Sequence, residues 1–120
     1  MAKNYRQDRI GEEIRRIISE MLLSDLKDPR LDSMISITDV EVTRDNSYAT
    51  VYFSPLGVTG SEEELQAKQE EVLEAFNKAK GFIRSRIGHE MKLRHVPELI
   101  FEVDHSMEYS RHIEDIIRTL

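Results

Sequence analysis

The sequence contains no cysteine and only three prolines among its 120 residues. Without cysteine, disulfides and thiolate metal sites are excluded, and a cytoplasmic location is natural. No apolar run approaches the roughly 20 residues that a membrane-spanning helix needs. The polar residues 1–13 offer no hydrophobic segment for a signal peptide. We therefore expect a small, soluble, cytoplasmic domain without a membrane partner.

The sequence motifs of common enzyme classes are also missing. It has no phosphate-binding G-x-x-x-x-G-K-[ST] or G-x-G-x-x-G loop, no H-E-x-x-H and no G-x-S-x-G. The histidines have no ligand-like spacing with a supporting carboxylate, and we interpret each as a surface or packing residue; they are His89, His95, His105 and His112. The sequence predicts no catalytic site, metal, cofactor or small-molecule substrate.

Charge is distributed unevenly along the chain. The formal net charge is −6, yet residues 75–94 carry six cations against the single anion Glu90, so the rest of the chain sums to −11. The six cations are Lys78, Lys80, Arg84, Arg86, Lys92 and Arg94. A strongly positive segment in an acidic protein predicts one surface for a polyanion, with the remainder repelling it. The alternative is a solvated basic helix face.

Residues 6–27 have apolar residues at three- and four-residue spacing, which predicts an amphipathic helix after a tail at 1–5. Pro29 disfavours helical geometry at the residue before it and ends the helix. Four arginines lie among the polar positions: Arg6, Arg9, Arg15 and Arg16. They are either a second phosphate contact or a solvated face, and Arg6 and Arg9 are the better candidates for contact.

Two strands are predicted next, over 35–43 and 48–54. In the first, the alternation of apolar residues changes phase, and an extra residue near Thr38–Asp39 would reconcile it, which predicts a β-bulge. The second alternates cleanly. Residues 44–47, RDNS, have turn chemistry, so the strands form an antiparallel hairpin.

A long helical pattern follows the hairpin. Ser61 and Glu64 form an S-x-x-E capping box, and the helix is predicted to run to Ala79. Glycine inside a helix costs about 1 kcal/mol relative to alanine, so Gly81 predicts a kink or a close backbone approach. A kink would free backbone N–H groups at the start of a second helical piece, where the helix dipole favours anions.

The second helical piece carries Ile83, Ile87 and Met91 on its apolar side. Arg84, Gly88 and Lys92 are spaced by four and share a cationic flank, where the glycine would let a backbone approach.

Residues 98–104 are predicted as a third strand, parallel to the second because a helical crossover joins them. Residues 106–120 are predicted as a last helix, with Ser106 as its cap. The order is therefore α-β-β-α-kink-α-β-α in one domain over 1–120. It gives a two-layer α+β fold with a three-stranded sheet and helices on one face.

Several strings in this order resemble a known family: DRIGEEIRR, LKDPRL, ITDVEVTRDNSYATVYFS, KAKGFIRSRIGHEMKLRHVPELIFEVD and HSMEYSRHIEDII. With them the chain resembles the ribosome-binding factor A family over nearly all 120 residues. The resemblance implies a type II KH-like fold in which an Ala-x-Gly kink, here Ala79-Lys80-Gly81, replaces G-x-x-G. KH modules clamp a nucleic-acid backbone at this turn.

The resemblance also implies a function. Such a protein is a non-catalytic assembly factor that binds the immature small (30S) ribosomal subunit and its 16S rRNA. It assists late maturation and 5′-end processing of that rRNA, and it supports growth in the cold.

We predict that RNA contacts come from both cationic segments, and that the protein is monomeric. The predicted contacts are Lys78, Lys80, Gly81, Arg84, Arg86, Lys92 and Arg94, with Arg6 and Arg9. Phe82 is either a core residue or a platform on which a base stacks. Two other functions stay open: a module for an acidic protein partner, and a small hydrolase, which would lack a convincing nucleophile or base.

Overall fold

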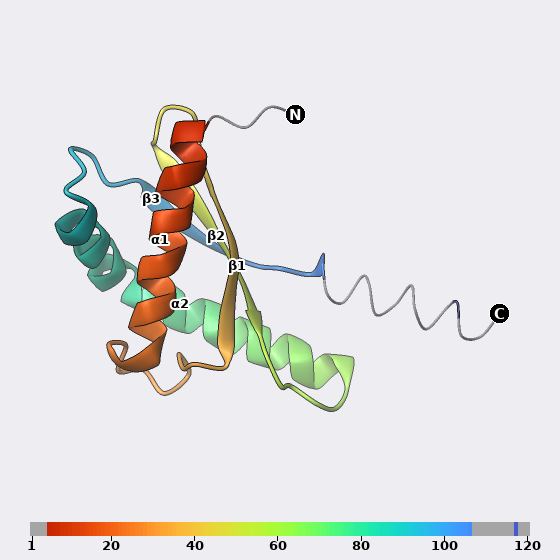
Figure 1. Ribbon diagram of the computed structural model, residues 1–120. Coiled ribbons are helices and arrows are strands. Elements are labelled where there is room, and N and C mark those ends of the chain that lie inside the picture. Colours follow the sequence, from red (N-terminus) through yellow and green to blue (C-terminus); the bar gives the residue numbers. More distant parts are fainter. Residues whose placement is uncertain (1–4, 107–116, 118–120) are drawn as a thin grey trace.

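The computed structural model describes residues 5–106 and residue 117. The elements, shown in Figure 1, are α1 (Tyr5–Ser24), β1 (Ile35–Val42), β2 (Tyr48–Pro55), α2 (Glu62–Met91) and β3 (Glu98–Val103). The predicted α+β class is confirmed. Most of the predicted tail at 1–5 and nearly all of the predicted helix over 106–120 lie outside the described residues.

The sheet has the strand order β1-β2-β3, with β1 antiparallel and β3 parallel to β2. Ile37 lies opposite Phe53, but Asp39 lies opposite Tyr52, so one residue of β1 is extra and the predicted bulge is confirmed. Asn46 has a φ of 61°, in the left-handed region that asparagine tolerates in turns. Hydrophobic alternation and turn chemistry therefore predicted the hairpin correctly.

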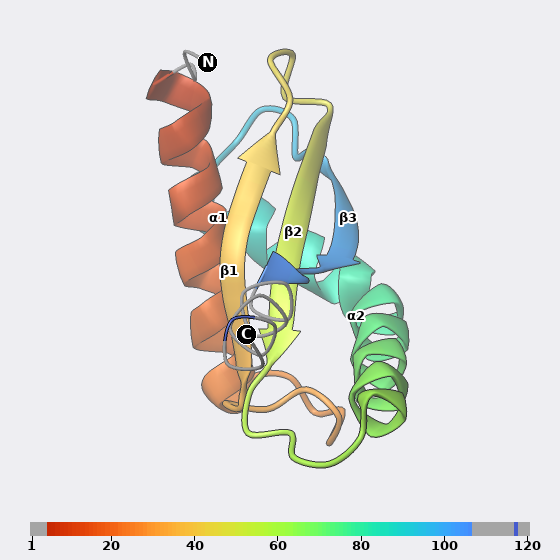
Figure 2. The same cartoon turned by 90° about the vertical axis from the view of Figure 1, so that its right-hand side faces the viewer.

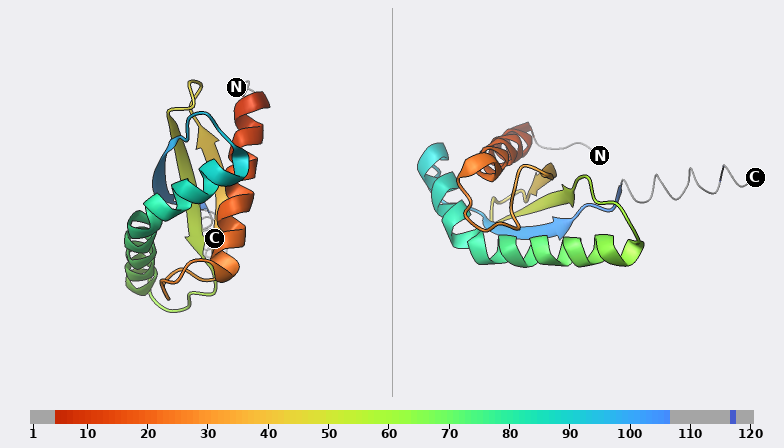
Figure 3. Two further views of the ribbon diagram at one scale, coloured as in Figure 1. Left: turned by 90° about the vertical axis from the view of Figure 1, so that its left-hand side faces the viewer. Right: turned by 90° about the horizontal axis from the view of Figure 1, so that it is seen from below.

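Both helices cover the same face of the sheet. Ala49, Val51 and Phe53 of β2 are fully buried, whereas the residues between them are partly exposed. Figure 2 shows the strands in front of the second half of α2, and the left panel of Figure 3 shows that half of α2 in front of the strands. The fold therefore has two layers, as the alternation in β2 predicted.

Helix α1 packs very close to the sheet at one glycine. A Cβ atom added to Gly11 would lie 2.6 Å from the carbonyl oxygen of Val40 in β1. Ile14, Ile17 and Ile18 follow Gly11 on the same helix and are fully buried. The absence of a side chain at Gly11 is what lets α1 pack this closely on β1.

Helix α2 is one continuous helix, so the predicted division into two helical pieces at Gly81 is wrong. Glycine weakens a helix but keeps its N–H donor, and apolar anchors on both sides, Phe76 and Ile83, are fully buried. The N–H groups near Gly81 belong to the helical ladder and are not freed for a ligand. A Cβ atom added to Gly81 would have open space within 4 Å, so no close backbone approach requires this glycine either.

A change of direction within α2 is present without a break. Figures 1 and 3 show that the axis bends in the second half of the helix, which then runs beside α1. Arg86 of α2 bonds Asp25, just beyond the C-terminal end of α1, while Met91 lies across a groove from Ile10, near the N-terminal end. The bend therefore brings the C-terminal end of the cationic half of α2 to the start of α1.

The N-terminal end of α2 is capped as predicted. The Ser61 hydroxyl accepts a hydrogen bond from the backbone N–H of Glu64 at 3.1 Å, and three glutamates occupy the first turn. These groups satisfy an otherwise unpaired donor and complement the positive end of the helix dipole.

Candidate nucleic-acid interface

The six cations of residues 75–94 do not line one surface. Arg84 and Arg86 are two positions apart on a helix, which separates their side chains by about 200° around the axis. Arg84 faces the connection between α2 and β3, while Arg86 faces the end of α1. The expectation of a single cationic face is therefore wrong, and the cations fall into groups with different surroundings.

Arg84 faces the protein itself. Its guanidinium donates to the carbonyl oxygens of Pro97 at 3.1 Å and Val96 at 2.9 Å, and Nη1 lies 3.8 Å from a carboxylate oxygen of Glu98. One side chain thus holds the short connection that leads from α2 into β3. Its hydrogen bonds to carbonyl groups cap a segment that makes no regular secondary structure.

The flank predicted around Arg84, Gly88 and Lys92 is occupied by the same connection. A Cβ atom added to Gly88 would lie 3.0 Å from a methyl group of Val96. Lys92 closes the helix in the left-handed conformation, with φ 52° and ψ 39°, and its N–H donates to the carbonyl oxygen of Gly88 at 3.1 Å. The glycine on this flank therefore gives room to the chain's own valine.

Arg86 and Phe82 lie on the opposite flank, beside the end of α1. Arg86 bonds the Asp25 carboxylate at 2.7 Å, and its guanidinium lies 5.6 Å from the centre of the Phe82 ring. The hydrogen bond from Arg86 holds the pKa of the Asp25 carboxyl below its ordinary value. Phe82 is 51% exposed, so the core interpretation is wrong for this residue. A pocket of about 330 Å³ lies beside it, with Ala79 among its lining residues.

Lys78 belongs to a network that the sequence analysis missed. It pairs with Glu74 at 3.1 Å, and Arg30 reaches the same carboxylate at 3.5 Å. Arg30 also makes a bidentate contact with Asp28, at 2.7 Å for the shorter bond, and the pKa of Asp28 falls to about 2 because of these hydrogen bonds. The Asp-Pro-Arg sequence shortly after the first helix was the available signal for this contact.

Lys80, Lys92 and Arg94 form no ion pair with any described residue. Lys80 is partly exposed, and Lys92 and Arg94 are exposed. Gly81, next to Lys80, is exposed as well. These cations are the ones whose charge the rest of the described structure leaves available to a partner.

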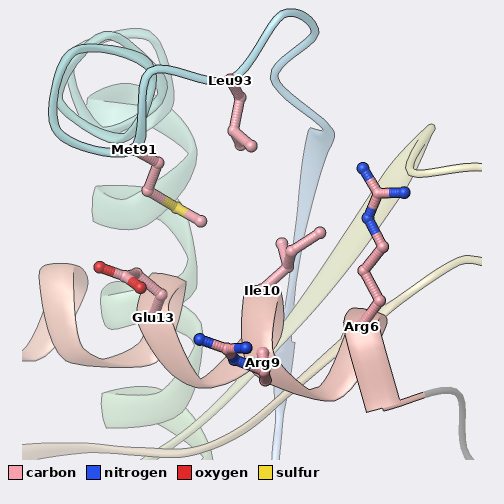
Figure 4. Close-up of a pocket in the computed structure, with 6 residues that line it drawn as sticks. All are labelled: Arg6, Arg9, Ile10, Glu13, Met91 and Leu93. Carbon is pink, nitrogen blue, oxygen red and sulfur yellow. The ribbon is translucent and has the colours of Figure 1, made fainter.

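A groove joins the end of the cationic segment to the start of α1. It has a volume of about 340 Å³ and is shown in Figure 4; its lining residues are Arg6, Arg9, Ile10, Glu13, Met91 and Leu93. Lys92 and Arg94 alternate with Met91 and Leu93 in sequence. The structure thus brings Arg6 and Arg9 next to residues 91–94, a proximity that sequence reasoning missed because it depends on the bend in α2.

Among residues 5–106 and 117, no group of three or more histidine, aspartate or glutamate side chains is arranged to hold a metal ion. No helix in this part of the chain combines the length and the apolar character that crossing a membrane requires.

The sequence model of the ribosome-binding factor A family matches residues 6–117. A ribosome-binding factor A of Caldanaerobacter subterraneus subsp. tengcongensis is 47% identical over 116 residues, covering 97% of this chain and 89% of the relative. One of Finegoldia magna is 46% identical over 113 residues, covering 93% of this chain and 88% of the relative.

Solved structures of the same description share the fold. The solution NMR structure of a Thermotoga maritima protein, a candidate ribosome binding factor A, has a TM-score of 0.67 and 36% identity and covers 85% of this chain and 90% of that one. The crystal structure of ribosome-binding factor A from Thermus thermophilus has a TM-score of 0.63 at 22% identity, with coverages of 81% and 94%. Sequence and fold agree, and the chain belongs to the ribosome-binding factor A family.

Proposed function

We propose that this protein is a non-catalytic assembly factor that binds the immature small ribosomal subunit through its 16S rRNA. In this proposal it acts in the cytoplasm as a monomer. It assists late maturation and 5′-end processing of the rRNA, including during growth in the cold.

The partner in this proposal is supported by a relative. A homology model of the Thermus thermophilus factor has been fitted into a cryo-EM map of its complex with the 30S subunit, and it matches this chain with a TM-score of 0.59 and 21% identity over 79% of this chain and 91% of that one. That likeness concerns the fold. The residues that would carry binding in this chain follow from its own charges.

The observation that carries the proposal is the meeting of two cationic segments in an acidic protein. Arg6 and Arg9 line one groove together with Met91 and Leu93, whose sequence neighbours Lys92 and Arg94 are exposed, while the chain as a whole has a net charge of −6. Phosphate contacts supply a large share of protein–RNA affinity, and an acidic remainder disfavours other docking orientations.

The predicted contact residues take different roles. We assign the main phosphate contacts to Lys80, Lys92 and Arg94 together with Arg6 and Arg9, with the exposed Gly81 allowing the RNA backbone to approach Lys80. Lys78 and Arg86 reach RNA by exchanging their carboxylate partners for phosphates. Arg84 acts indirectly, by holding the connection that carries Lys92 and Arg94.

The test is a charge reversal that spares the structural arginines. The double variant Lys80→Glu with Arg94→Glu changes two cations that pair with no described residue. The matched control, Arg44→Glu with Lys68→Glu, has the same net charge and lies on the hairpin turn and the acidic half of α2. Binding is measured by co-sedimentation with immature small subunits over a range of salt concentrations.

We expect the Lys80/Arg94 variant to lose subunit binding and the control to retain it. Loss of two phosphate contacts should also lower the slope of log affinity against log salt by about 2 for the residual binding. Equal co-sedimentation of wild type and the Lys80/Arg94 variant would refute the proposal. Persistence of the complex after RNase treatment would indicate an acidic protein partner instead.

A further inference from the structure

The groove between α1 and residues 91–93 is suited to bind a flat, partly apolar ligand. Ile10, Met91 and Leu93 pack against the core and remain only partly buried, so they form an apolar floor. Figure 4 shows Met91 and Leu93 pointing toward Ile10 from the other side of the groove. The volume of about 340 Å³ lies in the range of pockets that hold small ligands.

The charged groups that line the groove, Arg6, Arg9 and Glu13, all come from α1. Figure 4 shows Arg6 at one end and Glu13 at the other, on the same helix, with Ile10 between them. Lys92 and Arg94 are exposed and alternate in sequence with Met91 and Leu93. A nucleotide has matching parts: an anionic phosphate, an apolar base face, and hydrogen-bond donors at the far edge of the base.

The single carboxylate indicates which base would fit. The Glu13 carboxylate can only accept hydrogen bonds. Arg16 donates to its Oε1 at 3.1 Å, and because a carboxylate has about four acceptor positions in total, others are left for a ligand. Of the four RNA bases, guanine presents two adjacent donors on its Watson–Crick edge, N1–H and the N2 amino group. Uracil presents a single imide donor between two carbonyl oxygens, which a carboxylate would repel.

We propose that this groove holds one unpaired guanine of the bound RNA. The base lies on Ile10, Met91 and Leu93, its Watson–Crick edge donates to Glu13, and Arg6 and Arg9 contact the neighbouring phosphates. Unpaired bases are the usual target of sequence-specific RNA recognition. The inference rests on the proposed RNA-binding function and adds a base preference to it.

The experiment compares two short RNAs on the full chain. Fluorescence anisotropy measures the affinity for a labelled uridine hexamer and for the same hexamer with one central guanine. The variant Glu13→Gln replaces one acceptor oxygen by a donor at equal size. Glu12→Gln is the matched control, since Glu12 is the neighbouring exposed carboxylate, pairs with Arg15 and does not line the groove.

We expect the wild type to bind the guanine-containing hexamer about tenfold more tightly, the size of discrimination that a good bidentate base contact gives. Glu13→Gln should abolish this preference, and Glu12→Gln should keep it. Equal affinity of the wild type for the two hexamers, or a preference that survives Glu13→Gln, would overturn the inference while leaving the proposed function intact. A wild type that binds the subunit but neither hexamer would overturn it as well. Failure to bind both the hexamers and the subunit would sink the proposed function itself.

Discussion

Helices α1 and α2 cover the same sheet, but they make their contacts in different ways. The contact of α1 with β1 is apolar and close, with the backbone of Gly11 against the carbonyl of Val40. The charged residues of α1 pair mainly within the helix, as Arg16 does with Glu13 and Glu20. Helix α2 also buries apolar residues, but arginines join it to its surroundings, through Arg84 on one flank and Arg86 on the other.

This difference distinguishes close backbone contacts, which must keep their geometry, from surface ion pairs, whose members can exchange one charged partner for another. A close backbone contact cannot take an added methyl group without displacing one of the two elements. An ion pair at the surface is weak and can give way to a phosphate at small cost. The cationic half of α2 therefore serves both the fold and the proposed RNA contact, whereas the contact of Gly11 with β1 serves the fold alone.

The substitution with the largest expected effect is Gly11→Ala. An added Cβ would lie 2.6 Å from a backbone oxygen, and the helix would have to move away from β1. We expect a loss of about 2 kcal/mol in the free energy of unfolding, typical of an overpacked core, although alanine favours a helix by about 1 kcal/mol. Urea denaturation followed by circular dichroism measures it. An unchanged or raised midpoint would show that the contact between α1 and β1 is looser than described.

The next effect concerns the arginine that faces inward. Arg84→Met keeps an unbranched apolar stem but removes the donors to the Val96 and Pro97 carbonyls. Hydrogen bonds from charged groups contribute about 1.5–3 kcal/mol when buried; Arg84 is 35% exposed, so we expect a loss of about 1.5 kcal/mol. Lys80→Met is the matched control, and without a partner to lose it should change stability by less than about 0.5 kcal/mol. Equal effects of the two substitutions would contradict the separation of roles.

Much of the fold could be predicted from local sequence signals. The phase change within residues 35–43 predicted the bulge, the S-x-x-E sequence predicted the cap at Ser61, and the crossover predicted the parallel third strand. These signals depend on hydrogen bonding and burial within a few residues or between elements that are neighbours in the chain. Residue types and their order are therefore enough to predict them.

The glycines show where sequence reasoning failed. Gly81 drew attention because it interrupts a helical pattern, but the space around it is open, whereas Gly11 and Gly88 are the helical glycines that groups from other elements approach closely. A glycine's neighbours across the fold are not visible in the sequence around it. The same limit applies to the site, because the directions of Arg84 and Arg86 depend on which segments pack on each flank of α2.

Gly81→Ala tests whether a glycine with open space around it can be replaced without cost, in contrast to Gly11. Nothing lies within 4 Å of an added Cβ, and the helix is continuous there, so alanine should stabilise the protein by about 1 kcal/mol through its higher helix propensity. The sign is opposite to that expected for Gly11→Ala, measured by the same urea denaturation. A loss of stability would mean that the bend in α2 depends on glycine.

The smallest expected effect is the loss of the stability that Asp28 contributes, which occurs only in acid. Hydrogen bonds from Arg30 lower the pKa of Asp28 from its ordinary value of 3.8 to about 2. A carboxyl whose pKa is lower in the folded than in the unfolded state stabilises the fold at pH values above about 4, and that stabilisation is lost as the pH falls toward 2.

Asp28→Asn should therefore weaken the dependence of unfolding free energy on pH between about 4 and 2, measured by urea denaturation at several pH values. Glu71→Gln is the control, because Glu71 is an exposed carboxylate of α2 with no ion pair to a described residue. If both variants keep the wild-type pH dependence, the Arg30–Asp28 contact does not persist in solution. The ion pairs that join helix α2 to the segment after α1, Arg30 with Glu74 and Arg86 with Asp25, do not depend on that contact.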